Sequence, residues 1–259
     1  MNIHTAKGNK WLDDDLSHNL NKLNSNNIYE GDCLKFMKML PDGYFDLIIT
    51  DPPYGIDYDT LQNQMAESGR ISNGGKWISY DYFQWDKTIP AKEYFKEMLR
   101  VSKNQIIFGG NYFDLPKHTT WIIWNKIQRG FMTDGEMAWT SFDKSIYIFD
   151  MSRADAYINK DDKKVHPTQK PTALGRWILK NFATKDMKIL DPFAGSGSFL
   201  LACKQLGFDY VGCEINPEYI KIINSRLNQM SVSDFWSNDT HNRNLTEDFA
   251  KSSQINPTD

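Results

Sequence analysis

The chain has 259 residues, of which 40% are hydrophobic and 14% aromatic, enough apolar material for one large domain or for one domain with a modest appendage. Charged residues make up 24%, and no uninterrupted apolar run approaches the ~18 residues of a membrane-spanning helix, which excludes one. Residues 1–27 lack the basic cluster and apolar run of a signal peptide. The three cysteines, Cys33, Cys203 and Cys213, have no metal-type spacing, so we expect reduced core residues in a cytoplasmic protein.

The net charge of -3 hides an asymmetry along the chain. Residues 1–99 hold 10 basic and 15 acidic groups, residues 100–185 hold 14 and 8, and residues 186–259 hold 6 and 10. The middle is therefore +6, between flanks of -5 and -4. Such a basic segment in an acidic protein is typical of a confined polyanion-binding face, although chance clustering on a solvated surface gives the same pattern.

Short apolar runs alternate with amphipathic segments, as in an α/β protein whose parallel strands are buried on both faces. In chain order, strands are predicted at 28–30, 46–50, 105–109, 121–124, 145–149, 188–190 and 210–213. Helices are predicted at 33–40, 91–101, 172–182, 198–206 and 217–228.

Three stretches depart from this alternation. The polar residues 57–85 form a long loop, residues 127–165 mix charges and aromatics around one strand, and residues 231–259 form a polar tail. We therefore expect a polar N-terminal segment at 1–27, a main domain at 28–230 with a small recognition insert at 127–165, and a flexible tail at 231–259.

A strongly patterned segment, Asp51-Pro52-Pro53-Tyr54, follows the strand predicted at 46–50. Two consecutive prolines cannot continue a sheet, and they fix the chain just past the carboxyl end of the strand, where ligands bind in open α/β sheets. The Asp51 carboxylate and the Pro52 carbonyl accept hydrogen bonds, and Tyr54 offers a flat stacking surface. This combination suits a planar ring that carries an exocyclic amine, while a plain strand with a proline turn is the simpler alternative.

The amine of adenine is a poor nucleophile because its lone pair is delocalised into the ring. If Asp51 and the Pro52 carbonyl each accept one of its hydrogens, the nitrogen moves toward sp3 geometry and its lone pair is exposed to the methyl group of a sulfonium. Positioning for in-line attack would supply most of the catalysis, and no metal is required. Because the target atom lies inside a DNA stack, the base would be flipped out and stacked on Tyr54.

A second patterned segment runs from Lys188 to Leu201 and is typical of a strand, a glycine turn and a helix. Gly195 and Gly197 permit positive φ and a close approach of a ligand to the main chain. Nineteen residues after Gly195, Glu214 ends an apolar stretch at the position that receives ribose hydroxyls in a nucleotide-binding βαβ unit.

The glycine turn lacks the third glycine of a dinucleotide fingerprint, and no Gly-Lys-Ser/Thr ending is present. A ligand with an adenosine ribose but no phosphates therefore fits better, and S-adenosyl-L-methionine is such a ligand. A Gly-Ser-Gly turn alone can also be a simple connection between strand and helix.

With these two motifs, the sequence resembles the β-class amino-group DNA methyltransferases, in which an Asp-Pro-Pro-Tyr catalytic motif precedes the cofactor motif. The resemblance runs from about residue 28 to residue 228 and implies a Rossmann-like methyltransferase fold, with a seven-stranded mixed sheet, helices on both faces and a circularly permuted motif order. The implied catalytic residues are Asp51, Pro52, Pro53 and Tyr54. The implied cofactor-binding residues are Asp32, Cys33, Asp51, His166, Thr168, Lys170, Asp191, Phe193, Ala194, Gly195, Ser196, Gly197, Glu214, Ile215 and Asn216.

The resemblance also places target recognition in residues 127–165, within the basic middle of the chain, and makes 57–85 a loop that orders over DNA. Candidate phosphate or base contacts are Lys126, Arg129, Lys144, Arg153, Lys160, Lys163 and Lys164, any of which could instead be a solvated surface charge. The implied partners are DNA, a second copy of the chain and a cognate restriction endonuclease in a bacterial or phage-infected cell.

These features predict a site-specific DNA adenine methyltransferase, with three alternatives. A cytosine-N4 enzyme of the same class often has serine in place of the catalytic acid, so Asp51 favours adenine. RNA and protein-glutamine methyltransferases usually place asparagine first and have the cofactor motif earlier in the chain. A catalytically silent DNA-binding homologue would have no physical need for Asp51, Tyr54 and Glu214 together.

Overall fold

The computed structural model describes residues 9–10, 23, 25–56, 88–127, 133–157, 165 and 169–229. The predicted loop at 57–85 and the predicted tail at 231–259 lie outside these residues. The described strands are β1 (Asn9–Lys10), β2 (Asn27–Glu30), β3 (Phe45–Thr50), β4 (Ser102–Phe108), β5 (Trp121–Asn125), β6 (Gly135–Thr140), β7 (Tyr147–Asp150), β8 (Lys188–Asp191) and β9 (Asp209–Glu214). The described α-helices are α1 (Cys33–Lys38), α3 (Lys92–Val101), α4 (Thr172–Phe182), α5 (Ser198–Leu206) and α6 (Pro217–Gln229).

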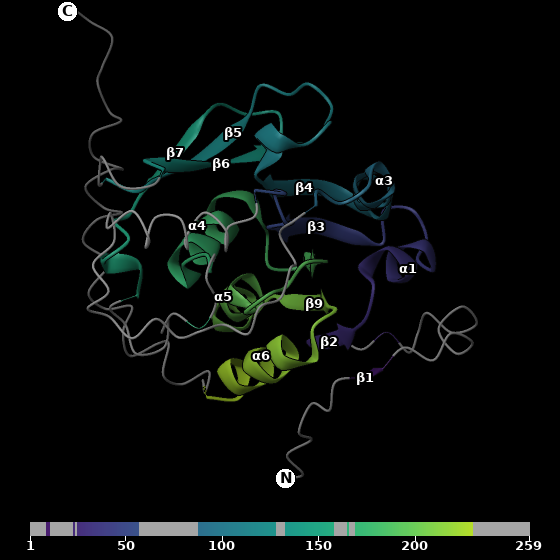
Figure 1. The fold of residues 1–259 in the computed structure, drawn as a ribbon. Helices are drawn as coiled ribbons and strands as arrows, with labels where there is room; N and C mark the ends of the chain where they lie inside the picture. The colour runs from purple at the N-terminus through teal and green to yellow at the C-terminus, as the bar shows by residue number, and fades with distance from the viewer. Residues whose placement is uncertain are drawn as a thin grey trace, which may run out of the picture.

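All of these strands join one mixed sheet in the order β1-β2-β9-β8-β3-β4-β6-β5-β7 (Figure 1). Among the described strands, only β6 is antiparallel to its neighbours, β4 and β5. The α/β fold predicted from the sequence, with a mixed sheet and helices on both faces, is confirmed, and all seven predicted strands are present. The sheet gains β1 and β6, so it has nine described strands where seven were predicted.

Strand β3 shows why the sheet carries helices on both faces. Leu47 and Ile49 join the apolar core under α4, α5 and α6, whereas Ile48 between them joins the core under α1 and α3. Because successive side chains of a strand point to opposite faces, a nearly continuous apolar run supplies both cores. The two helical layers are visible on either side of the sheet in Figure 1.

The cysteines agree with the sequence analysis. Cys33, Cys203 and Cys213 are free and buried, as predicted. Among the described residues, no helix combines the length and the apolar character needed to cross a membrane.

Strands β6 and β7 lie within residues 127–165, so the sheet occupies part of the segment assigned to the recognition insert. Strand β6 was missed because Gly135-Glu136-Met137 starts it with partly or fully exposed residues and a charge, which gives neither an apolar run nor clean alternation.

Helices α4 and α5 approach closely at Gly175. A Cβ atom added to Gly175 would lie 2.8 Å from the Cβ atom of Ala202 on α5. The absence of a side chain at 175 therefore sets the spacing of these two helices.

We predict that Gly175→Ala lowers the free energy of unfolding by roughly 1–3 kcal/mol, because overpacking outweighs the better helix propensity of alanine. Urea denaturation measures the effect. The double variant Gly175→Ala/Ala202→Gly removes the clash and should recover most of the loss, whereas purely additive effects would contradict this explanation.

Candidate functional site

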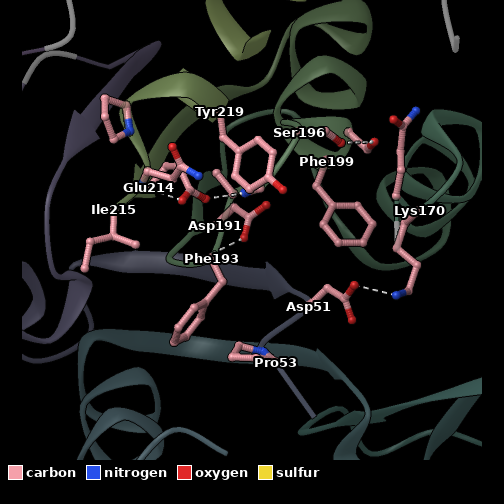
Figure 2. Close-up of a pocket in the computed structure, with 16 residues that line it drawn as sticks. Asp51, Pro53, Lys170, Asp191, Phe193, Ser196, Phe199, Glu214, Ile215 and Tyr219 are labelled. Carbon is pink, nitrogen blue, oxygen red and sulfur yellow. Dashed lines mark hydrogen bonds and ion pairs between the residues drawn. The ribbon is translucent and has the colours of Figure 1, made fainter. Parts of the chain in front are cut away.

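A cavity of about 570 Å³ opens at the carboxyl ends of β3, β8 and β9, within the size range of small-molecule sites. The three strands are parallel neighbours or next neighbours, so their last residues meet at one edge of the sheet. Figure 2 shows Glu214 and Ile215 toward one end of the cavity and Asp51 and Lys170 toward the other, with Asp191 and Phe193 between them. The cavity therefore joins the two motifs that the sequence singled out.

The glycine turn between β8 and α5 forms the floor beside Glu214. Gly195 and Gly197 have φ values of 52° and 77°, as the sequence predicted. A Cβ atom added to Gly195 would meet no atom within 4 Å, so the cavity comes close to the main chain there. The turn leaves room for a ligand against the backbone.

The Glu214 carboxylate is fixed by main-chain donors on both of its oxygens. Oε2 accepts from the Gly195 amide at 2.7 Å, and Oε1 accepts from the Asn216 amide at 2.9 Å. Burial raises the pKa of Glu214 to about 7, against the opposing effect of these amides. Each oxygen retains acceptor capacity, so two neighbouring hydroxyl groups of a ligand can donate to it.

Asp191 lies at the end of β8, in the middle of the cavity. Its Oδ1 accepts from the Thr50 hydroxyl at 2.8 Å and from the Phe193 amide at 3.2 Å. Burial raises the pKa of Asp191 to about 8 despite these donors. The contact with Thr50 ties the ends of β3 and β8 together where both motifs begin.

At the other end of the cavity, Asp51 makes two charged or polar contacts. The Tyr54 hydroxyl donates to Oδ1, and the Lys170 ammonium donates to Oδ2. Burial raises the pKa of Asp51, and the positive charge of Lys170 opposes this rise. Burial alone would lower the pKa of Lys170, but the carboxylates of Asp51 and Glu136 outweigh burial and raise it. Lys170 is therefore held as an ammonium beside a carboxylate that faces the cavity.

Tyr54 lies next to this contact and packs among aromatic rings. Its ring stacks on Tyr112 with centroids 5.1 Å apart, and Phe113 meets it edge-on at 6.1 Å. Burial raises the pKa of Tyr54 well above its usual value, so the hydroxyl remains a donor.

The structure brings most of the predicted site residues to the cavity. The predicted residues that line it are Asp51, Pro53, Lys170, Asp191, Phe193, Ala194, Gly195, Ser196, Glu214, Ile215 and Asn216. Pro52, Tyr54, Asp32, Cys33 and Gly197 do not line it. Asp32 caps α1 by accepting from the Leu34 amide and also accepts from the Tyr94 hydroxyl, while Cys33 is buried in the core.

Among the predicted DNA contacts, Lys126 requires a correction. Only 5% of Lys126 is exposed, and its ammonium lies 2.5 Å from Glu136 Oε1, so it is committed to a buried ion pair rather than to a phosphate. Lys144 and Arg153 remain candidate contacts, although Lys144 donates to the Asn181 carbonyl and Arg153 to the Thr133 carbonyl. The predicted residues His166, Thr168, Arg129, Lys160, Lys163 and Lys164 lie outside the described residues.

Sequence reasoning missed several residues of the site. Gln169, Ser198, Phe199, Pro217 and Tyr219 also line the cavity. Each of them lies within a few residues of a predicted site residue in the sequence, so closeness along the chain was the signal that could have found them. Thr50 and Glu136 carried no signal, because their importance comes from partners far away in the sequence.

The chain is similar to known DNA-modifying enzymes. Residues 123–225 match the DNA methylase family. Over 236 residues the chain is 29% identical to the type II methyltransferase M.HpaI of Haemophilus parainfluenzae, covering 75% of this chain and 72% of the relative. It is 26% identical to the type II methyltransferase M2.MboI of Moraxella bovis, covering 79% and 88%. The solved PvuII DNA methyltransferase, described as cytosine-N4-specific, has the same fold at 14% identity, with a TM-score of 0.50 over 83% of this chain and 91% of that chain.

The fold and the cavity define a methyltransferase-like α/β protein with a nucleoside-sized site. The comparisons confirm the resemblance to the amino-group DNA methyltransferases that the motifs indicated. The name of the matched family covers both N6 and N4 methylases, and the PvuII enzyme is described as cytosine-N4-specific, so the similarity leaves the modified base open.

We predict that Thr50→Val raises the pKa of Asp191 above about 8, because the neutral carboxyl gains further when the donor to its ionised form is lost. NMR titration of 13C-labelled aspartate carboxyls, assigned with Asp191→Asn, measures this pKa. Thr50→Ser keeps the hydroxyl and should leave the pKa near its original value. Equal pKa values in the two variants would show that the Thr50 contact is not important for Asp191.

Proposed function

We propose that this protein is a site-specific, S-adenosyl-L-methionine-dependent DNA adenine methyltransferase that modifies the N6 amine of a flipped-out adenine. The observation that carries the proposal is the single cavity with Glu214 toward one end and Asp51 toward the other. One end suits a ribose, and the other suits an amine. A nucleoside cofactor and an amine-bearing base can therefore meet in one site.

The residues around Glu214 fit S-adenosyl-L-methionine. The Glu214 carboxylate would accept the two ribose hydroxyls, and Gly195 leaves space against the main chain. The exposed side chain of Ile215 and the ring of Phe193 supply apolar surface for an adenine. When bound, the cofactor supplies a methyl group on a positively charged sulfur.

Asp51 would act on the base and not on the cofactor. Its carboxylate would accept a hydrogen bond from the amine and draw the nitrogen lone pair out of the ring. The sequence-based role of the Pro52 carbonyl as a second acceptor would require the bound base to reach past the residues that line the cavity. The nitrogen forms the new bond to carbon while the bond from that carbon to sulfur breaks, and the extra proton on the nitrogen leaves through Asp51 to water. The cavity walls hold the partners for in-line attack.

The choice of adenine rests on Asp51, because cytosine-N4 enzymes of the class often have serine there. Cytosine-N4 methylation is the second candidate, and the PvuII enzyme shows that the fold serves such a reaction. The similarity to DNA methyltransferases supports DNA as the substrate. We also propose that the protein pairs with a second copy of the chain and works beside a cognate restriction endonuclease.

We predict that Asp51→Asn lowers methyl transfer roughly 100- to 1000-fold, the loss typical of one preorganised polar group in an active site. The assay uses methyl-labelled cofactor and mixed-sequence duplex DNA, and mass spectrometry identifies the modified nucleoside. Cofactor affinity should stay near that of the wild type, and Asp114→Asn, at an exposed ion pair, is the control. Methylcytosine from the wild type would replace the main proposal by its alternative, and full turnover by Asp51→Asn would remove Asp51 from the mechanism.

We also predict that cofactor affinity falls as the pH is lowered through about 7. The ionised Glu214 accepts both ribose hydroxyls, so binding favours the ionised form, and protonation below its pKa of about 7 opposes binding. Calorimetry from about pH 6 to about pH 8 measures the dependence. Glu214→Gln should bind more weakly at the upper pH and lose this part of the pH dependence, whereas identical curves for the two proteins would contradict the ribose assignment.

A further inference from the structure

Four charged side chains form a chain of alternating sign that starts at Asp51. The Lys170 ammonium contacts the Asp51 carboxylate and lies 2.9 Å from Glu136 Oε2. The other Glu136 oxygen lies 2.5 Å from the Lys126 ammonium. We call Asp51, Lys170, Glu136 and Lys126 the charge chain.

The members of the charge chain come from distant parts of the sequence. Asp51 follows β3, Lys170 precedes α4, Glu136 lies on β6, and Lys126 follows β5. Strand β6 brings the last two together, because Glu136 pairs in register with Trp124, two residues before Lys126. Lys126 is further held by Thr133 at 3.2 Å and lies over the Trp124 ring.

The charge chain is largely removed from water. The side chains of Lys170 and Lys126 are 4% and 6% exposed, and those of Asp51 and Glu136 are 18% and 22% exposed. Burial would raise the pKa of Glu136, but Lys170 and Lys126 outweigh it and lower that pKa to about 2. Glu136 is therefore ionised, and Lys170 is held as an ammonium, whereas burial raises the pKa of Asp51 and lowers the pKa of Lys126 at the two ends of the charge chain.

Stability alone does not account for such an arrangement. Replacing a buried ion pair by apolar side chains of similar volume is often neutral or stabilising, so a buried pair is weak evidence for a role in stability. The charge chain, however, ends on the carboxylate that faces the cavity. Its members beyond Asp51 are suited to control the orientation and ionisation of that carboxylate.

We propose that Lys170, Glu136 and Lys126 are positioning residues for methyl transfer: Glu136, held by Lys126, fixes the Lys170 ammonium against Asp51, and Lys170 keeps the Asp51 carboxylate ionised and oriented. This inference rests on the proposed function. It extends that function to Lys126 and Glu136, which do not line the cavity. It also gives Lys170 a role toward the catalytic acid, where the sequence resemblance implied one toward the cofactor.

Because the charges alternate, each substitution is expected to shift the pKa of Asp51 in a defined direction. Lys170 lowers the pKa of Asp51, whereas Glu136 raises it. Removing Lys170 should therefore raise the pKa of Asp51, and neutralising Glu136 should lower it. Removing Lys126 leaves Glu136 uncompensated, so the pKa of Asp51 should rise, by less than for Lys170. Within the described part of the chain, the other charged or titratable groups that act on these residues are Tyr54 beside Asp51, Asp191 on β8 and Arg153 after β7.

The experiment compares kcat against pH for Lys170→Met, Glu136→Gln and Lys126→Met. The acidic limb of the profile reports ionisation of Asp51. We expect this limb to move to higher pH in Lys170→Met and Lys126→Met, and to lower pH in Glu136→Gln. At the plateau, kcat should fall roughly ten- to hundredfold, as expected when a reacting group is misplaced by a fraction of an ångström to an ångström. For Glu136→Gln and Lys126→Met the cofactor Kd should stay unchanged. Lys103→Met, at the exposed pair with Asp46, is the matched control and should leave the limb in place.

The pKa of Asp51 is also measured without turnover, by NMR titration of 13C-labelled aspartate carboxyls assigned with Asp51→Asn. Folding of each variant is checked by thermal denaturation, and Lys126→Arg, which keeps the charge, should restore the wild-type limb. Wild-type protein that methylates no DNA would overturn the proposed function, while the NMR titration would still decide whether the charge chain controls Asp51. Shifts that all have one sign, or no shifts, would overturn the inference even in an active enzyme.

Discussion

The parallel pairing of β3 with β8 determines where every part of the site lies. The register that places Leu47 opposite Ile189 and Ile48 opposite Leu190 brings the last residues of both strands to one edge of the sheet. The hydrogen bond from the Thr50 hydroxyl to Asp191 closes this edge in the protein interior. One strand then leads into the proline-rich segment, and the other into the glycine turn. A slip of either strand by one residue would turn its side chains to the opposite face of the sheet. The apolar pattern that builds the two cores therefore also fixes the positions of the site residues.

The electrostatics of the cavity differ between its two ends. Near the glycine turn, main-chain amides oppose the cost of burying Glu214, and the carboxylate titrates near neutral pH. Near the proline-rich segment, an ammonium group opposes the cost of burying Asp51. Main-chain amides carry no net charge, whereas the buried Lys170 ammonium carries a full charge and is paired with Glu136 as well as with Asp51. The second end therefore requires a further layer of charged residues, and the first does not.

The sequence predicted the fold class and both ends of the cavity, because local patterns encode them. The apolar run before Asp51, the paired glycines at 195 and 197 and the spacing to Glu214 each lie within a short window. The role of Glu136 was not predictable in this way, since it depends on Lys170, which is 34 residues away, and on a strand that begins with glycine and a charge. Lys126 was misassigned for the same reason: a lysine in a basic segment is expected on the surface until its buried partner is known.

Under the proposed function, the position of β6 has a consequence for exchanging the predicted recognition insert between enzymes. Residues 127–165 are the natural segment to transplant, but β6 within it is hydrogen-bonded to β4 and β5 and carries Glu136. A chimera that replaces the whole segment would change the electrostatics around Asp51 together with the DNA contacts. Grafts that retain Gly135–Thr140 and replace only the connections on either side separate the two effects. Under the proposed function, the segment predicted to recognise DNA and the charged residues around Asp51 are linked through a single antiparallel strand.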